Sequence, residues 1–243
     1  MPHKSKGLRR FAARLECFQE DIEVADIFYK NMEDIADVDK LFKGVTATYP
    51  LLNRRQSSRH NRMLVSTHLK HTLYVSILKE IYEEVMLYLD YCLTCGALTL
   101  DNPERLVGND NKINMTANDI LMLDSREKIV TVIMQGIFRK LEGKRDTLLL
   151  INELNNRLGL DISENVINKA MPYFEARHKF VHSDGIPDEE YLQKYPQMKL
   201  TENGKIKLNK EIMQKVFTTA RALVNEFERK MAEKGYFLPE EYQ

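Results

Sequence analysis

The chain has 243 residues, 43% of them hydrophobic and 30% charged, with only 10 glycines and 7 prolines. This composition is typical of a globular protein with a sizeable core and excludes collagen-like and intrinsically disordered chains. Lysine plus arginine and aspartate plus glutamate each total 36, so net charge cannot attract nucleic acid or an anionic membrane. The three cysteines form no disulfide framework. With no secretion signal or membrane-spanning segment evident, we expect a cytoplasmic protein that does not associate with membranes.

Two long helices are predicted in the first half of the chain. Apolar residues over 11–42 recur at steps of three and four, as one face of an amphipathic helix requires. Tyr49-Pro50 ends this pattern, because the residue before a proline avoids helical angles. A second helix is predicted over 61–97, and its apolar residues cover more than one face, which places it at the centre of a bundle. The stretch 101–118 is predicted to be a loop containing some local structure.

Three further helical segments follow. Asp124-Ser-Arg-Glu127 has the order of a capping box and precedes a helix that ends before Gly143. The segment 147–158 continues the helical pattern and ends at Gly159, where a left-handed residue is expected. Ser163 can cap the next helix, and Pro172 within it predicts a kink or a new helix start.

The C-terminal part is predicted to contain a small hairpin and a last helix. Asn203-Gly204 separates two short alternating segments, which is a strong signal for a β-hairpin. Asn209 can cap a helix that ends before Gly235. We therefore predict one all-α domain over 1–243, an antiparallel bundle of long helices with a small β-hairpin before the last one. Residues 1–60 supply the N-terminal helix and a basic linker, and residues 61–238 supply the core bundle.

The most informative residues for function are Arg177, His178 and His182. Arginine presents a planar fork that suits a phosphate, and an imidazole exchanges protons near neutral pH. On a regular helix His178 and His182 share a face, whereas Arg177 and His182 lie about 140° apart. Arg177 and His182 are thus expected to converge if the helix frays at Val181, or if a second copy of the chain completes the site.

Arg177-x-x-x-x-His182, with a polar residue after the arginine and an apolar pair before the histidine, resembles the signature of the HEPN superfamily of helical proteins. Gly159-Leu-Asp-Ile-Ser and the segment 177–185 resemble its RiboL-PSP-HEPN and related defence-associated branches. The resemblance covers residues 61–234 and is strongest over 158–191.

The resemblance implies an endoribonuclease that needs no metal or other cofactor and works as a symmetric homodimer on an RNA substrate. His182 would deprotonate a ribose 2′-hydroxyl, and Arg177 would stabilise charge on the attacked phosphoryl group. His178, or His182 of a second copy, would protonate the leaving oxygen. The products would be a 2′,3′-cyclic phosphate and a 5′-hydroxyl. Such a protein could act in toxin–antitoxin or antiviral defence, with an antitoxin or regulatory protein as partner.

Other interpretations of the same residues stay open. Some members of the superfamily are not catalytic, so the surface could serve an adaptor that binds a protein or a nucleotide. Arg177 and His182 could instead form a structural pair at a helix end. His178, His182 and Asp184 could ligate a divalent metal. Cys92-x-x-Cys95 resembles half of a zinc or redox site, but its apolar helix favours buried thiols.

A basic cluster outside the motif is a candidate for RNA binding. Arg54, Arg55, Arg59 and Arg62 fall within nine residues and could contact phosphates locally. A solvated linker is the alternative. Base stacking would require exposed aromatic rings, for which Tyr49, Tyr173 and Tyr191 are the candidates.

Overall fold

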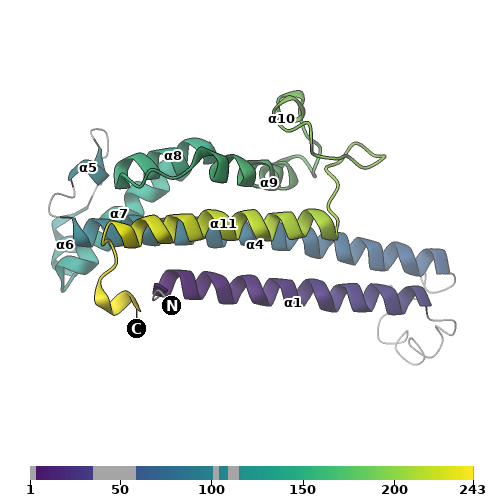
Figure 1. Ribbon diagram of the computed structural model, residues 1–243, viewed down its shortest axis with the longest axis horizontal. Coiled ribbons are helices and arrows are strands. Elements are labelled where there is room, and N and C mark those ends of the chain that lie inside the picture. The colour runs from purple at the N-terminus through teal and green to yellow at the C-terminus, as the bar shows by residue number, and fades with distance from the viewer. Residues whose placement is uncertain (1–3, 35–58, 101–103, 109–114, 243) are drawn as a thin grey trace.

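The computed structural model describes residues 4–34, 59–100, 104–108 and 115–242. In Figure 1 the helices form layers, with α1 on one side, α4 and α11 in the middle, and α8 and α9 on the other side. The described residues contain no β-strand, and the all-α class is confirmed. The elements are α1 (Lys6–Asp34), α4 (Arg59–Thr99), α5 (Glu104–Val107), α6 (Ala117–Leu121), α7 (Arg126–Glu142), α8 (Thr147–Leu158), α9 (Glu164–His182), α10 (Glu189–Lys194), α11 (Lys210–Glu233) and the 3-10 turn η1 (Pro239–Tyr242).

The central position predicted for the second long helix is confirmed. The helix α4 contacts α1, α7, α8, α9 and α11. Its residues from Tyr74 to Ala97 include many fully buried apolar side chains, as a helix surrounded by others requires. The first helix begins at Lys6, five residues before the predicted start. The remainder of that prediction, 35–42, lies outside the described residues.

Most of the predicted helix ends are found where the capping residues indicated. Gly159 ends α8 in the left-handed conformation, with φ of 62°. The side chain of Asn209 accepts a hydrogen bond from the amide of Ile212 at the start of α11. The cap of α7 is Ser125 rather than Asp124, because the Ser125 hydroxyl accepts from the Lys128 amide. Asp124 instead pairs with the Lys128 ammonium at 2.7 Å.

Pro172 does not start a new helix, so this alternative in the prediction is wrong. The helix α9 runs from Glu164 to His182 with Pro172 inside it. Pro172 is buried, and its carbonyl oxygen accepts a hydrogen bond from the Tyr191 hydroxyl at 2.8 Å. Packing of the ring and this bond offset part of the cost of proline in a helix.

The predicted hairpin is reduced to one antiparallel bridge between Leu200 and Ile206. Thr201 and Lys205 close a three-residue loop, and Gly204 in it has φ of 73°. Such a loop ends with a left-handed residue, which explains the glycine. The chain therefore reverses at Asn203-Gly204 as predicted, but through a three-residue loop instead of the two-residue turn, and no two-stranded ribbon extends from it among the described residues. A short helix that was not predicted, α10, precedes it and is capped by Asp188.

Polar contacts across the bundle fix the directions of its long helices. Asp26 of α1 pairs with Lys70 of α4 at 2.5 Å and with Lys210 of α11 at 2.9 Å. At the other end, Glu228 of α11 accepts a hydrogen bond from the Tyr88 hydroxyl of α4 at 2.8 Å. Thus α4 and α11 run parallel, and α1 runs antiparallel to both. The bundle is not antiparallel throughout.

The buried Glu228 carboxylate also anchors the N-terminus of α1. It accepts hydrogen bonds from the Ser5 amide and hydroxyl, both at 2.7 Å. Three donors therefore surround one buried carboxylate, two from the residue that precedes α1 and one from α4. Such bonds matter because a buried charge without partners is strongly destabilising.

Tyr88→Phe removes one of these donors and leaves the ring in place. We expect it to lower the free energy of unfolding by about 1–3 kcal/mol, since it deprives a buried charge of a hydrogen bond. Urea denaturation measures the change. Tyr29→Phe is the matched control, because the Tyr29 hydroxyl makes no hydrogen bond among the described residues. Equal stability of the two variants would contradict this role of Glu228.

Candidate active site

The end of α9 is held in a defined conformation. The amides of Ser183 and Gly185 both donate to the carbonyl oxygen of Lys179, at 2.8 and 3.1 Å. Gly185 has φ of 80°, and a Cβ there would lie 2.4 Å from the Phe180 ring. A glycine is therefore required at this turn. The helix continues through His182, so the fraying at Val181 that would bring Arg177 toward His182 does not occur.

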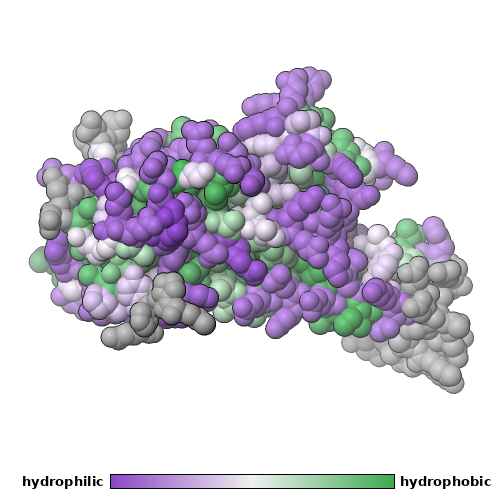
Figure 2. All heavy atoms as spheres, in the orientation of Figure 1, coloured by the Kyte–Doolittle hydropathy of each residue, from purple (hydrophilic) through white to green (hydrophobic). Residues whose placement is uncertain are grey.

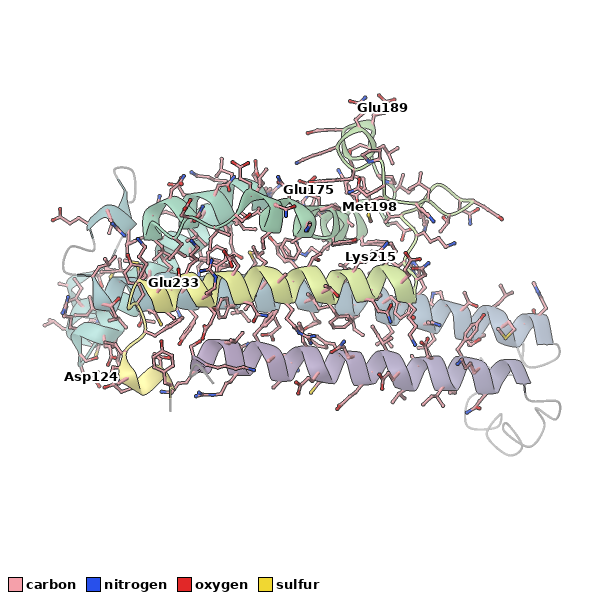
Figure 3. All side chains as sticks on the ribbon, in the orientation of Figure 1. Asp124, Glu175, Glu189, Met198, Lys215 and Glu233 are labelled. Carbon is pink, nitrogen blue, oxygen red and sulfur yellow. The ribbon has the colours of Figure 1, made fainter. Side chains whose placement is uncertain are left out.

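Arg177, His178 and His182 nevertheless line one cleft. The cleft has a volume of about 390 Å³ and lies among α4, the turn between α7 and α8, α9 and α10. Figure 3 labels Glu175 on α9 and Glu189 at the start of α10, and Figure 2 shows a mostly hydrophilic surface around α10. The residues that line the cleft are Tyr82, Glu142, Arg145, Asp146, Thr147, Leu150, Phe174, Glu175, Arg177, His178, Lys179, His182, Glu190 and Lys194.

The two imidazoles lie next to each other on an exposed face of α9. Their ring centroids are 4.4 Å apart, with 53° between the ring planes. Partial desolvation in the cleft lowers the pKa of His178, and the nearby charges of His182, Lys179, Arg177 and Arg145 lower it further. His178 is thus a weaker base than an ordinary histidine, in a pair of imidazoles that can exchange protons with a ligand.

Arg177 is held by two neighbouring residues of α4. Its guanidinium carbon lies 4.3 Å from the centre of the Tyr82 ring, and one terminal nitrogen, Nη2, donates to Glu83. Tyr82 in turn packs edge-to-face on Phe174 at 5.6 Å, and its hydroxyl lies 3.3 Å from the Thr147 hydroxyl. The guanidinium is therefore fixed on an aromatic ring, a typical arginine contact.

Sequence reasoning missed the contribution of α4 to this site. Tyr82 and Glu83 lie in the central helix α4, far from the motif in sequence. Glu83 leaves its side chain 51% exposed, and a charged residue in an apolar run was the available signal. Arg145 and Lys194 were missed as well, since neither belongs to a recognisable motif.

The structure does not bring the basic cluster into the cleft. Arg54 and Arg55 lie outside the described residues. Arg59 and Arg62 lie in the first turn of α4, and nothing is described of their side chains. Among the described residues of that helix, Tyr82 is the one that lines the cleft. Their proposed contact with RNA stays a prediction.

Two of the three stacking candidates are wrong. Tyr173 and Tyr191 are both buried, and the Tyr191 hydroxyl donates to the backbone of α9. Tyr49 lies outside the described residues. Both rings pack in the core between α9 and its neighbours. The sequence pattern did not distinguish such buried rings from exposed ones.

The cysteine pair is buried, as its apolar helix predicts. Cys92 and Cys95 are free thiols in the core, and burial raises the pKa of Cys95 to about 12. No three His, Cys, Asp or Glu side chains within the described parts of the chain are arranged to hold a metal ion. Asp184, the third ligand of the metal interpretation, pairs with Lys205.

No family model, curated protein or solved structure matches this chain. The resemblance to the HEPN superfamily therefore stays a prediction from the sequence. Among the helices described, none is both long and apolar enough to cross a membrane.

The pKa of His178 is expected below its ordinary value of 6.5, and it can be measured by NMR titration of the imidazole protons. His182→Gln removes a neighbour that becomes cationic, so it should raise that pKa. His68 lies on α4 and does not line the cleft. His68→Gln should therefore leave the pKa of His178 unchanged. Because folding disfavours protonation of His178, its contribution lowers the free energy of unfolding as the pH falls through 6.5. An unaltered His178 titration in His182→Gln would contradict the coupling of the two rings.

Proposed function

We propose that this protein is a metal-independent endoribonuclease that cleaves RNA by attack of the ribose 2′-hydroxyl on the adjacent phosphorus. The observation that carries the proposal is the cleft that Arg177, His178 and His182 line together. An arginine beside two imidazoles provides what this transesterification needs, namely a cation for the phosphoryl oxygens, a base and an acid.

The two imidazoles suit different steps. A base must be neutral before the reaction, and the lowered pKa of His178 favours the neutral form of that ring. An acid must carry a proton for the leaving 5′-oxygen. His178 and His182 can divide these roles within one copy, although the sequence assigned the base to His182. The pair thus makes the chemistry possible without a metal ion.

The Glu83 ion pair is compatible with phosphate binding. It engages Nη2 of Arg177, while Nη1 has no hydrogen-bond partner among the described residues. A phosphate oxygen can therefore accept from Nη1 while Glu83 and Tyr82 keep the guanidinium in position. Arginine is suited to such shared contacts because its donors point in several fixed directions.

The first test is cleavage of mixed RNA in EDTA by the purified protein. His182→Ala should lower the rate by at least about 100-fold, which is the usual contribution of a general acid or base. His182 is exposed, so its loss should change the free energy of unfolding by less than about 0.5 kcal/mol. His68→Ala is the matched control and should cleave normally.

The products distinguish the proposed chemistry from its rivals. We expect 2′,3′-cyclic phosphate ends and no cleavage of 2′-deoxy substrates. Cleavage that requires an added metal ion would favour the metal interpretation, and no cleavage under any condition would favour the adaptor. Either result would refute the proposed ribonuclease.

We also propose a homodimer with the motif near its two-fold axis, as isologous contacts are the commonest in oligomers. Val181 and Ile186 flank His182 and are 42% and 53% exposed, which suits an apolar contact there. Light scattering should give a mass near twice 28.5 kDa. Excess His182→Ala protein should lower wild-type activity if the two copies share a cleft. Full specific activity of a demonstrated monomer would refute a shared cleft and favour the pair within one copy.

A further inference from the structure

The cations around the cleft differ in whether a carboxylate neutralises them. Lys179 pairs with Asp188 at 2.5 Å, and Lys194 pairs with Glu175 at 2.6 Å. Arg177 pairs with Glu83. Arg145 makes no ion pair among the described residues, and its side chain is exposed. Of these four lining cations, Arg145 is therefore the one whose charge is available to an anionic ligand.

The backbone holds Arg145 in an unusual conformation at the rim of the cleft. Its φ is 57°, in the left-handed region that a residue with a Cβ seldom adopts. The turn before it is closed by hydrogen bonds from the Lys144 amide to Leu141 and from the Arg145 amide to Glu142, at 3.2 and 3.0 Å. Asp146 follows directly and caps α8. The end of α7 and the start of α8 thus fix the backbone position from which the Arg145 side chain extends.

The electrostatics of the cleft agree with this position. Arg145 is one of the charges that lower the pKa of His178, so its guanidinium acts on that imidazole across the cleft. The aromatic ring of the cleft, in contrast, is already in contact with other groups, since Tyr82 packs on Arg177 and Phe174. Phosphate recognition is therefore favoured over base stacking in this part of the cleft.

We propose that Arg145 binds a second phosphate of the RNA, adjacent to the one attacked at Arg177 and the histidines. The inference rests on the proposed function and specifies its substrate, which must be an oligonucleotide with at least two successive phosphates. A dinucleoside monophosphate contains the reacting bond but has no second phosphate for Arg145 to bind. The enzyme therefore prefers longer single strands and reads their backbone at this position.

The test compares a trinucleoside diphosphate with a dinucleoside monophosphate of the same bases. The trinucleotide places a phosphate next to whichever bond is cleaved. For the wild type we expect kcat/KM to be about tenfold higher for the trinucleotide, as one charge-assisted contact allows. Arg145→Gly and Arg145→Asn should abolish this preference and cleave both substrates at similar rates. Both replacements tolerate a positive φ, so the turn is retained.

Lys144→Ala is the matched control, because Lys144 is the adjacent exposed cation and does not line the cleft. It should keep the tenfold preference of the wild type. An equal loss of preference in Lys144→Ala would show a general effect of charge and overturn the assignment to Arg145. A preference that survives both Arg145 variants would overturn it as well.

Binding of the 2′-deoxy analogues separates this inference from the proposed reaction. They carry the same phosphates but lack the nucleophile, so their dissociation constants do not depend on catalysis. The wild type should bind the trinucleotide analogue about tenfold more tightly than the dinucleotide, and the Arg145 variants should bind both alike. If no RNA is cleaved but this pattern holds, the proposed reaction fails and the phosphate site remains. If cleavage occurs without the pattern, the Arg145 site fails alone.

Discussion

The buried carboxylate of Glu228 is the constraint on which the arrangement of the long helices depends. A carboxylate in a core must be surrounded by donors, and here they come from Ser5 and from Tyr88 of α4. These bonds set how α1, α4 and α11 are aligned along their axes. Asp26 does the same at the other end, where hydrogen bonds from Lys70 and Lys210 lower its pKa against the opposing effect of partial desolvation. Apolar packing alone leaves such alignment poorly specified, because similar side chains can exchange places.

The fixed position of α4 determines what Arg177 can do. Tyr82 and Glu83 face α9 only because α4 is aligned with its neighbours, and together they orient the guanidinium at the cleft. A flexible arginine would lose side-chain entropy on binding an anion, whereas one already ordered on a ring has lost it on folding. The site thus consists of a motif on one helix and a support on another. In the proposed enzyme, α4 contributes orientation and α9 contributes the reacting groups.

Local sequence signals predicted the helices well because their causes are local. Caps such as Asn209 and the left-handed Gly159 act through the nearest backbone groups, so they can be recognised in a single segment. The new helix start that was one alternative at Pro172 was wrong, because burial of the ring and the Tyr191 hydrogen bond come from tertiary contacts. Tyr173 and Tyr191 were misjudged as exposed for the same reason. Periodicity identified the face shared by His178 and His182, but it could not identify Glu83 or Tyr82, which approach from a distant part of the chain.

The cleft also shows why an angle of about 140° on one helix does not separate Arg177 from His182. That angle describes where side chains leave the helix axis, whereas a ligand meets the surface formed by several elements. The turn between α7 and α8 and the helix α10 enclose the face of α9, so residues on both sides of that face line one cavity. Arginine extends far enough to reach across this distance, and Tyr82 directs it there. Convergence of the motif therefore depends on the neighbouring turn and helix, without any fraying of α9.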